Sequence, residues 1–287
     1  MNLADISTIK KLLSVDDFSF KKSLGQNFLI DETVCPQMAA AAADEDTGVL
    51  EIGPGIGVLT RELAAVAKRV VTVELDERLR PVLKKTLADL DNTKVIFADA
   101  MKLDLHALIA EEFSDCSRVA VCANLPYYIT SPIIMKLLES RLPIDNITVM
   151  VQKEAAERLC AEVSSREAGA VTVAVKYYAE GEILFRVGRD SFMPPPKVDS
   201  AVIKLMVRKT PAVVVANEER FFSLVKACFA QRRKTLLNTV SSTLHIEKTE
   251  LAMCLKEMEL PADIRAEKLT LQQLCSLSNL MLEKKLY

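Results

Sequence analysis

Between residues 48 and 152, short runs of apolar and β-branched residues alternate with longer stretches of helical spacing. Parallel strands of one sheet must be joined by long crossovers, usually helices, so this alternation predicts a parallel sheet covered by helices. The apolar runs predict five strands, at residues 48–53, 69–75, 94–98, 118–124 and 146–152. Residues that end these strands are therefore the first candidates for a binding site.

The segment after the fifth strand predicts a helix and two further strands. Residues 153–163 have helical spacing, and the run 170–178 fits either a helix or a strand. Residues 182–188 and 200–208 have strand-like patterns, and a proline-rich segment joins them. We expect these two strands to form a hairpin that closes a seven-stranded, mostly parallel sheet.

The last quarter of the chain has a different pattern. From residue 218 on, apolar residues recur at intervals of three and four, and no strand pattern returns. A chain of 287 residues is long enough for one large and one small domain. We expect an α/β domain over residues 1–210 and a small all-α domain over residues 211–287.

Composition excludes several classes of protein. Hydrophobic residues make up 50% of the chain and charged residues 26%, which is typical of globular proteins. No apolar run reaches the roughly 18 residues of a membrane span, and the polar N-terminus is unlike a secretory signal. The seven cysteines are scattered without a C-x-x-C pair, and the two histidines lack a metal-binding pattern. We expect a cytoplasmic, metal-free protein, and nothing in the sequence requires more than a monomer.

Residues 49–57 read Val-Leu-Glu-Ile-Gly-Pro-Gly-Ile-Gly, a buried strand that runs into a glycine-dense turn and then a helix. Glycines there let the backbone approach a ligand and place helix N–H groups near it. A dinucleotide fingerprint needs glycine where Val58 stands, and the Gly-Lys-Ser/Thr of a P-loop is absent. The G-x-G-x-G form at Gly53, Gly55 and Gly57 is commoner for ligands without a pyrophosphate, such as S-adenosylmethionine.

Acidic residues stand at the next two predicted strand ends. Glu74 ends the second strand, where a carboxylate can accept hydrogen bonds from both ribose hydroxyls. Asp99, with Ala100 and Met101, ends the third strand, where it can accept from an adenine amino group while Met101 packs nearby. Taken singly, these features also fit a plain turn, a solvated strand end and a helix cap. Their occurrence at three strand ends in order favours a nucleoside site.

The fourth predicted strand ends in Asn124-Leu125-Pro126-Tyr127-Tyr128, which suits methylation of an amino group on a base. The adenine N6 lone pair is delocalised into the ring, so acceptors that hold both N6 hydrogens favour a more pyramidal, more nucleophilic nitrogen. We expect the Asn124 side-chain oxygen and the Pro126 carbonyl to be these acceptors, and Tyr127 to stack on the extruded base. Placement and electrostatics then suffice, without a titrating base. The alternative is a β-turn with core tyrosines, and we expect Tyr128 to serve packing.

Together these residues resemble the ribosomal RNA adenine N6,N6-dimethyltransferases, whose bacterial members modify two adjacent adenines near the 3′ end of small-subunit (16S) rRNA. The resemblance covers nearly the whole chain. It implies a Rossmann-like class I methyltransferase fold, S-adenosylmethionine as cofactor, and a role in ribosome biogenesis. It rests on residues 22–29 (KSLGQNFL), 51–55 (EIGPG), 74–76 (ELD), 99–101 (DAM), 124–127 (NLPY), 192–200 (FMPPPKVDS) and 231–236 (QRRKTL).

The resemblance also implies roles for individual residues. Phe192, which precedes three prolines, is implied to face Tyr127 across the target base. Glu51 is implied either to approach the methionine ammonium of the cofactor or to hold the turn. Cofactor contacts are implied for Asn27, Leu29, Gly53, Gly55, Glu74, Asp99, Ala100 and Asn124.

Three alternative functions stay open. Related enzymes that methylate a large-subunit adenine share the cofactor motifs but tend to carry Ser-Gln-Asn-Phe and Asn-Ile-Pro-Tyr. This chain has Gly-Gln-Asn-Phe at residues 25–28 and Asn-Leu-Pro-Tyr at 124–127, which favours the small subunit. The other two alternatives are an inactive RNA-binding assembly factor and a methyltransferase for a protein amide or a small molecule.

The expected partner is small-subunit rRNA, naked or in a pre-ribosomal particle, which calls for a basic face around the cleft. The net charge is −2, but positive residues gather at Lys21-Lys22 and at Arg232-Arg233-Lys234. We expect the second group to open a helix of the second domain, and the two groups to hold an RNA stem on either side of the pocket. An ordinary solvated helix face is the alternative for the second group.

Overall fold

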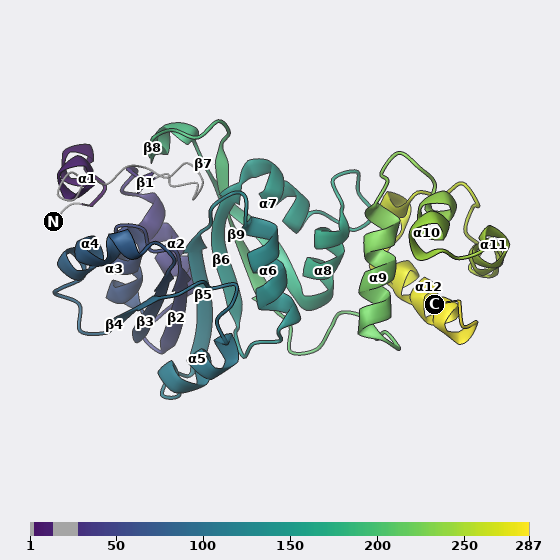
Figure 1. Ribbon diagram of the computed structural model, residues 1–287, viewed down its shortest axis with the longest axis horizontal. Coiled ribbons are helices and arrows are strands. Elements are labelled where there is room, and N and C mark those ends of the chain that lie inside the picture. Colours follow the sequence, from purple (N-terminus) through teal and green to yellow (C-terminus); the bar gives the residue numbers. More distant parts are fainter. Residues whose placement is uncertain (1–2, 14–27, 287) are drawn as a thin grey trace. The chain divides into compact units, whose positions relative to one another are not determined.

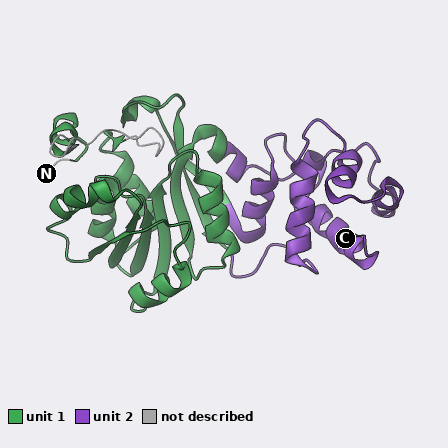
Figure 2. Ribbon diagram, in the orientation of Figure 1, with its two compact units in different colours: residues 1–156, 181–207 green, residues 157–180, 208–287 purple. Residues whose placement is uncertain are grey.

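The structure is a computed structural model that describes residues 3–13 and 28–286 (Figure 1). The chain divides into two compact units (Figure 2). The first unit contains the residues up to 156 together with 181–207, and the second contains 157–180 together with the residues from 208 on. In the described part of the chain, no helix is long and apolar enough to span a membrane.

A seven-stranded sheet with the order β4-β3-β2-β5-β6-β9-β7 forms the centre of the first unit. β2 pairs in parallel with β3 and β5, β3 pairs in parallel with β4, and β5 with β6, whereas β9 runs antiparallel to β6. The predicted seven-stranded, mostly parallel sheet is therefore confirmed, and the bounds of the five parallel strands agree with the prediction to within one residue. The strands are β2 (Thr47–Ile52), β3 (Arg69–Glu74), β4 (Thr93–Phe97), β5 (Arg118–Asn124), β6 (Asn146–Gln152), β7 (Ala179–Val187) and β9 (Ser200–Val207).

The strand order reverses next to β2, and this reversal positions the site. From β2 the chain continues to β3 and β4 on one side, and then crosses to β5 on the other side of β2. Open α/β sheets bind ligands outside the carboxyl ends of the strands at such a switch point. The residues that follow β2 and β5 therefore lie next to each other at this end of the sheet.

Helices and a small second sheet complete the first unit. α2 packs on α3 and against β5, β6 and β9. β1 (Phe28–Leu29) and β8 (Phe192–Met193) form a separate antiparallel pair, in which Leu29 lies opposite Phe192. The helices of this unit are α1 (Ile6–Leu13), α2 (Val34–Ala42), α3 (Val58–Val66), α4 (Arg80–Thr86), α5 (Leu105–Glu112), α6 (Thr130–Glu139) and the first half of α7 (Lys153–Cys160).

The second unit contains helices. α9 packs against α8, α10 and α12, and Tyr177 and Tyr178 of α8 form an aromatic cluster with Phe221 and Phe222 of α9. Glu218 accepts a hydrogen bond from each tyrosine hydroxyl, which satisfies these polar groups inside the cluster. The helices are α8 (Ala170–Tyr178), α9 (Glu218–Phe229), α10 (Leu236–Leu244), α11 (Lys248–Glu257) and α12 (Leu271–Glu283).

The two units differ from the predicted domains in one segment. Residues 157–180, which the prediction places in the α/β domain, belong to the second unit because α8 contacts α9 and α12. The division after residue 207 lies close to the predicted boundary at 210. The predicted domain division itself stays a prediction.

Candidate active site

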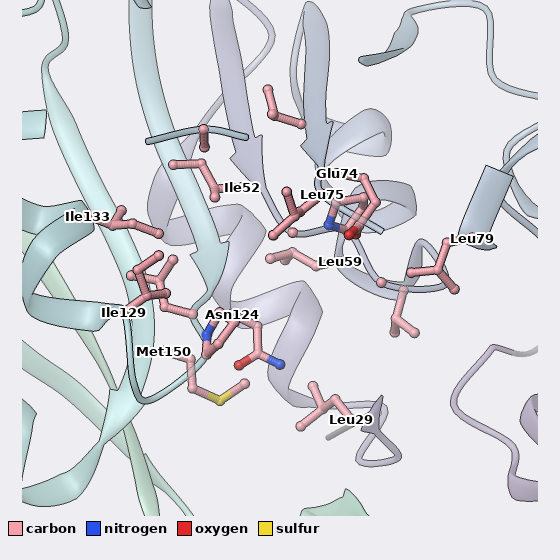
Figure 3. Close-up of a pocket in the computed structure, with 18 of the residues that line it drawn as sticks. Leu29, Ile52, Leu59, Glu74, Leu75, Leu79, Asn124, Ile129, Ile133 and Met150 are labelled. Atoms are coloured by element: carbon pink, nitrogen blue, oxygen red, sulfur yellow. The ribbon is translucent and has the colours of Figure 1, made fainter. Parts of the chain in front are cut away.

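A cavity opens at the carboxyl ends of β2, β3, β4 and β5 (Figure 3). Figure 3 shows Glu74 and Leu79 on one side and Asn124 and Met150 on the other. Ten of the predicted site residues line this one cavity: Leu29, Gly53, Gly55, Glu74, Asp99, Ala100, Asn124, Pro126, Tyr127 and Phe192. Among its described lining residues Glu74 and Asp99 are acidic, and none is lysine or arginine.

The glycines of the turn after β2 have different neighbours. Gly53 has a φ of +74°, and a Cβ added there would meet no atom within 4 Å, although the residue lines the cavity. Open space beside a backbone that only glycine adopts easily is what a closely held ligand requires. Gly57 has a φ of +94°, and a Cβ there would come within 2.8 Å of the Leu87 side chain. Gly53 therefore leaves room for a ligand, whereas Gly57 lets α3 pack closely on the end of α4.

Glu74 is the last residue of β3, as predicted, and is buried. Its Oε1 accepts a hydrogen bond of 2.7 Å from the backbone N–H of Asp76. Burial raises the pKa of Glu74, while the backbone N–H groups of Asp76 and Gly55 act in the opposite direction. Leu75 follows with 53% of its surface exposed and lines the same cavity, so an apolar side chain stands beside the carboxylate.

Asp99 lies two residues beyond the end of β4, not at the strand end itself. Its Oδ1 accepts a hydrogen bond of 2.9 Å from the backbone N–H of Met101, which fixes the carboxylate from one side. The Lys102 ammonium is 3.8 Å from Oδ2 and is largely exposed, so the charge of Asp99 is only weakly neutralised. Among the described residues, none donates a hydrogen bond to Oδ2, which only the Lys102 ammonium approaches.

Asn124 ends β5 as predicted, and the turn after it is held by several hydrogen bonds. The carbonyl of Pro126 accepts from the Ile129 N–H at 3.1 Å and from the Thr130 hydroxyl at 3.3 Å. The Tyr127 hydroxyl is 2.9 Å from Ser200 Oγ, and burial raises the pKa of this phenol, so it remains neutral. Tyr128 was expected to serve packing, but 58% of its surface is exposed at the cavity.

Phe192 reaches the cavity through the small β1–β8 sheet. It pairs with Leu29, and the Ser191 carbonyl accepts a hydrogen bond of 2.8 Å from the Ile30 N–H. The Ser191 hydroxyl also donates to Asp31 Oδ2 at 3.1 Å. These bonds tie the segment after β1 to the loop that carries Phe192, so Leu29, predicted to contact the cofactor, and Phe192, predicted to contact the base, are held by one element.

Glu51 lies behind the turn rather than in the cavity lining. The side chain is fully buried, and its Oε2 accepts a hydrogen bond of 2.7 Å from the Thr60 hydroxyl. Its Oε1 has no hydrogen-bond partner among the described residues. Burial raises the pKa of Glu51 to about 7. Of the two implied roles, this placement favours holding the turn, because Thr60 belongs to α3.

The remaining predicted residues lie away from the cavity lining or outside the described part of the chain. Lys21, Lys22 and Asn27 lie outside the described residues. Arg232, Arg233 and Lys234 are exposed in a turn, and do not open a helix as expected. The reason is Thr235, whose hydroxyl accepts from the Asn238 N–H and caps α10 at Leu236.

Sequence reasoning missed Leu75 and Ser200 as parts of the site. A weak sequence signal marks Leu75. It is an apolar residue that directly follows Glu74, where the strand gives way to a turn and offers no position in the core. Ser200 carries no local signal, because it meets Tyr127 across 73 residues of sequence. No group of three or more potential metal ligands occurs among the described residues.

Comparisons with known proteins show what this chain is similar to. The model of the ribosomal RNA adenine dimethylase family matches residues 17–283. A ribosomal RNA small subunit methyltransferase A from Geobacillus thermodenitrificans is 50% identical over 285 residues, which cover 97% of each chain. The crystal structure of a dimethyladenosine transferase from Plasmodium falciparum superposes with a TM-score of 0.75 and 28% identity, covering 90% of this chain and 98% of that one. The 23S rRNA methyltransferase ErmE gives a TM-score of 0.66 and 29% identity, covering 88% and 98%.

Proposed function

This chain belongs to the ribosomal RNA adenine dimethylase family, and from that premise we propose that it dimethylates N6 of two adjacent adenines near the 3′ end of small-subunit rRNA, with S-adenosylmethionine as methyl donor. An rRNA adenine dimethyltransferase activity follows from the family and from relatives about half identical over nearly the whole chain. One observation carries the proposal for the two adjacent adenines and the methyl donor. The carboxylates of Glu74 and Asp99, which suit a nucleoside, line the same cavity as the Asn124 turn.

The chemistry of the cavity fits S-adenosylmethionine. Glu74 and Asp99 offer carboxylate acceptors for ribose hydroxyls and an adenine amino group, and Leu75 offers an apolar surface for the ring. The open space beside Gly53 suits a ligand part that lies against the backbone. The absence of lysine and arginine from the described lining disfavours a pyrophosphate and suits a cationic sulfonium. When bound, S-adenosylmethionine supplies an electrophilic methyl group.

The Asn124 turn supplies the acceptors that hold the amino group of the target adenine. Asn124 Oδ1 is the first acceptor for a hydrogen of the adenine N6 amino group. The Pro126 carbonyl already accepts from Ile129 and Thr130, which uses both of its lone pairs. No described residue donates to the Leu125 carbonyl. Leu125 is therefore the better second acceptor, and Pro126 acts by fixing the turn that presents it.

Two aromatic residues are placed to hold the extruded base. The bond to Ser200 restrains the Tyr127 ring, and the β1–β8 pairing restrains Phe192. Stacking on rings that are already fixed costs little side-chain entropy when the base enters. The exposed ring of Tyr128 offers further surface at the mouth of the cavity.

The partner and the place of action belong to the same proposal. We infer that the substrate is small-subunit rRNA or a pre-ribosomal particle in the cytoplasm, and that the protein acts as a monomer. The identity to small-subunit methyltransferases over nearly the whole chain favours this substrate over a large-subunit adenine. The presence of every acceptor in one cavity favours an enzyme over an inactive assembly factor.

Methyl transfer to purified under-methylated subunits tests the proposal. Labelled S-adenosylmethionine is supplied with small or large subunits, and the product is mapped by nuclease digestion and mass spectrometry. We expect dimethyladenosine at two adjacent positions near the 3′ end of the small-subunit rRNA. Asn124→Ala should lower kcat by roughly 100-fold or more, as loss of a transition-state hydrogen bond does.

Asn279→Ala is the matched control. It removes the same amide from α12 of the second unit, where it bonds the backbone at Val214 and Ala216. This variant should keep its methyl transfer rate. Transfer to large subunits alone, or equal rates for both variants, would overturn the proposal.

A further inference from the structure

Lys136 lies in the last turn of α6 and is partly buried. Its ammonium nitrogen is 3.1 Å from the Ala100 carbonyl oxygen, 2.7 Å from that of Met101 and 3.0 Å from that of Leu103. A lysine ammonium has three donors and no acceptor, so all three are used by the loop of residues 98–104. This loop follows β4 and carries Asp99.

One of these bonds continues to the carboxylate of Asp99. The carbonyl of Ala100 and the N–H of Met101 belong to the same peptide group. Its carbonyl accepts from Lys136, and its N–H donates to Asp99 Oδ1 at 2.9 Å. Hydrogen bonds in such a chain polarise and strengthen each other. The charge on Lys136 therefore both orients this peptide and strengthens its bond to Asp99.

We infer that Lys136 is a positioning residue for recognition of the cofactor's adenine, acting through the Ala100–Met101 peptide on Asp99. This inference rests on the proposed function, because it takes the adenine of S-adenosylmethionine as the group that Asp99 holds. α6 begins directly after the Asn124 turn. The same helix thus connects the turn that holds the target adenine with the loop that holds the cofactor.

The loop has bonds of its own that do not depend on Lys136. The backbone N–H groups of Lys102 and Leu103 both donate to the Asp99 carbonyl, at 2.9 and 3.1 Å. These bonds close the turn whatever stands at position 136. Loss of the ammonium should leave the turn closed but free the Ala100–Met101 peptide to rotate. The expected defect is in the orientation of the Asp99 carboxylate, not in folding.

Binding of S-adenosylhomocysteine and S-inosylhomocysteine, measured by isothermal titration calorimetry, tests this inference without turnover. The inosyl analogue has an oxygen in place of the adenine amino group. It therefore lacks the amino group whose hydrogen bond Asp99 is proposed to accept. Lys136→Met should weaken S-adenosylhomocysteine binding about tenfold, the cost typical of one misplaced hydrogen bond to a charged group. It should weaken binding of the inosyl analogue much less. In an Asp99→Ala background, Lys136→Met should have no further effect.

Lys68→Met is the matched control, because Lys68 also donates to a backbone carbonyl, that of Asp115, away from the cavity lining. It should bind both compounds as the wild type does. Thermal unfolding without ligand shows whether Lys136→Met is folded. Unchanged S-adenosylhomocysteine affinity, or equal weakening for both compounds, would overturn the role of Lys136 while the cofactor assignment stands. Failure of the wild type to bind S-adenosylhomocysteine would overturn the proposed cofactor and this inference with it.

Discussion

Glu51 carries a carboxyl group into the core with one oxygen unpaired, and its pKa of about 7 lies above its ordinary value of 4.5. The folded protein therefore keeps a proton that the unfolded chain releases between these two values. The free energy of unfolding must fall as the pH rises through this window. Glu51→Gln, a neutral mimic of the protonated acid, should match the wild type only below the unfolded pKa, near pH 4. Near pH 8 it should be more stable by about 3 kcal/mol in urea unfolding.

The groups that face Glu51 support this direction. The charge of Glu74 raises the pKa of Glu51, and the thiols of Cys35 and Cys122 are kept neutral because burial raises their own pKa values. The Thr60 and Thr72 hydroxyls act in the opposite direction and lower the pKa of Glu51. Glu77→Gln, which removes an exposed carboxylate outside the core, serves as the control for the loss of one charge. Parallel stability curves for the wild type and Glu51→Gln would contradict the prediction.

Residues at strand ends could be predicted from the sequence, because one physical rule brings them together. Glu74, Asn124 and the glycine turn follow parallel strands, whose carboxyl ends meet at one edge of the sheet. Lys136 and Ser200 could not be predicted in this way. Each contacts the site through a hydrogen bond to a residue more than 30 positions away in the sequence. No regular spacing of residue types links the two partners.

At the scale of the elements, two glycines in the turn from β2 to α3 should have different roles, one in ligand binding and one in packing. Gly57→Ala places a Cβ against Leu87 in a strained backbone conformation and should cost about 1–3 kcal/mol of stability. Gly53→Ala carries backbone strain too, but its Cβ meets no protein atom and enters the ligand space, so of the two variants it should weaken S-adenosylhomocysteine binding more. Thermal unfolding and calorimetry measure the two effects separately. A larger loss of affinity in Gly57→Ala than in Gly53→Ala would contradict this division.

Helices with one buried face and strands buried on both faces could be predicted from the spacing of their apolar residues. The segment 170–178 shows why other elements could not. Its valines alternate as in a strand, at residues 171, 173 and 175, yet the segment forms α8. Residues 172–175 are all buried, so no polar face remains to reveal the helical period. The choice is made by contacts with α9 and α12, which local sequence does not contain. The predicted start of α10 was wrong for a more local reason. The prediction began the helix at the basic residues 232–234 and overlooked Thr235, which caps it.

At the scale of the whole molecule, a net charge of −2 must coexist with binding to a polyanion. The basic turn of Arg232, Arg233 and Lys234 is exposed, and the Arg232 guanidinium also donates to the carbonyl of Arg166. If the two arginines contact phosphates, Arg232→Ala with Arg233→Ala should weaken rRNA binding. It should also flatten the dependence of log K on log salt by about two units, one for each contact.

The affinity for S-adenosylhomocysteine should not change in this double variant, because the turn lies outside the described cavity lining. Lys248→Ala with Lys256→Ala removes the same charge from exposed positions of α11, so it separates a local contact from the general effect of charge. A contact at the basic turn requires the salt slope to fall in the arginine variant and to stay nearer the wild-type value in the lysine variant. Equal slopes in the two variants would mean that only total charge matters, and that RNA contacts phosphate elsewhere on the protein.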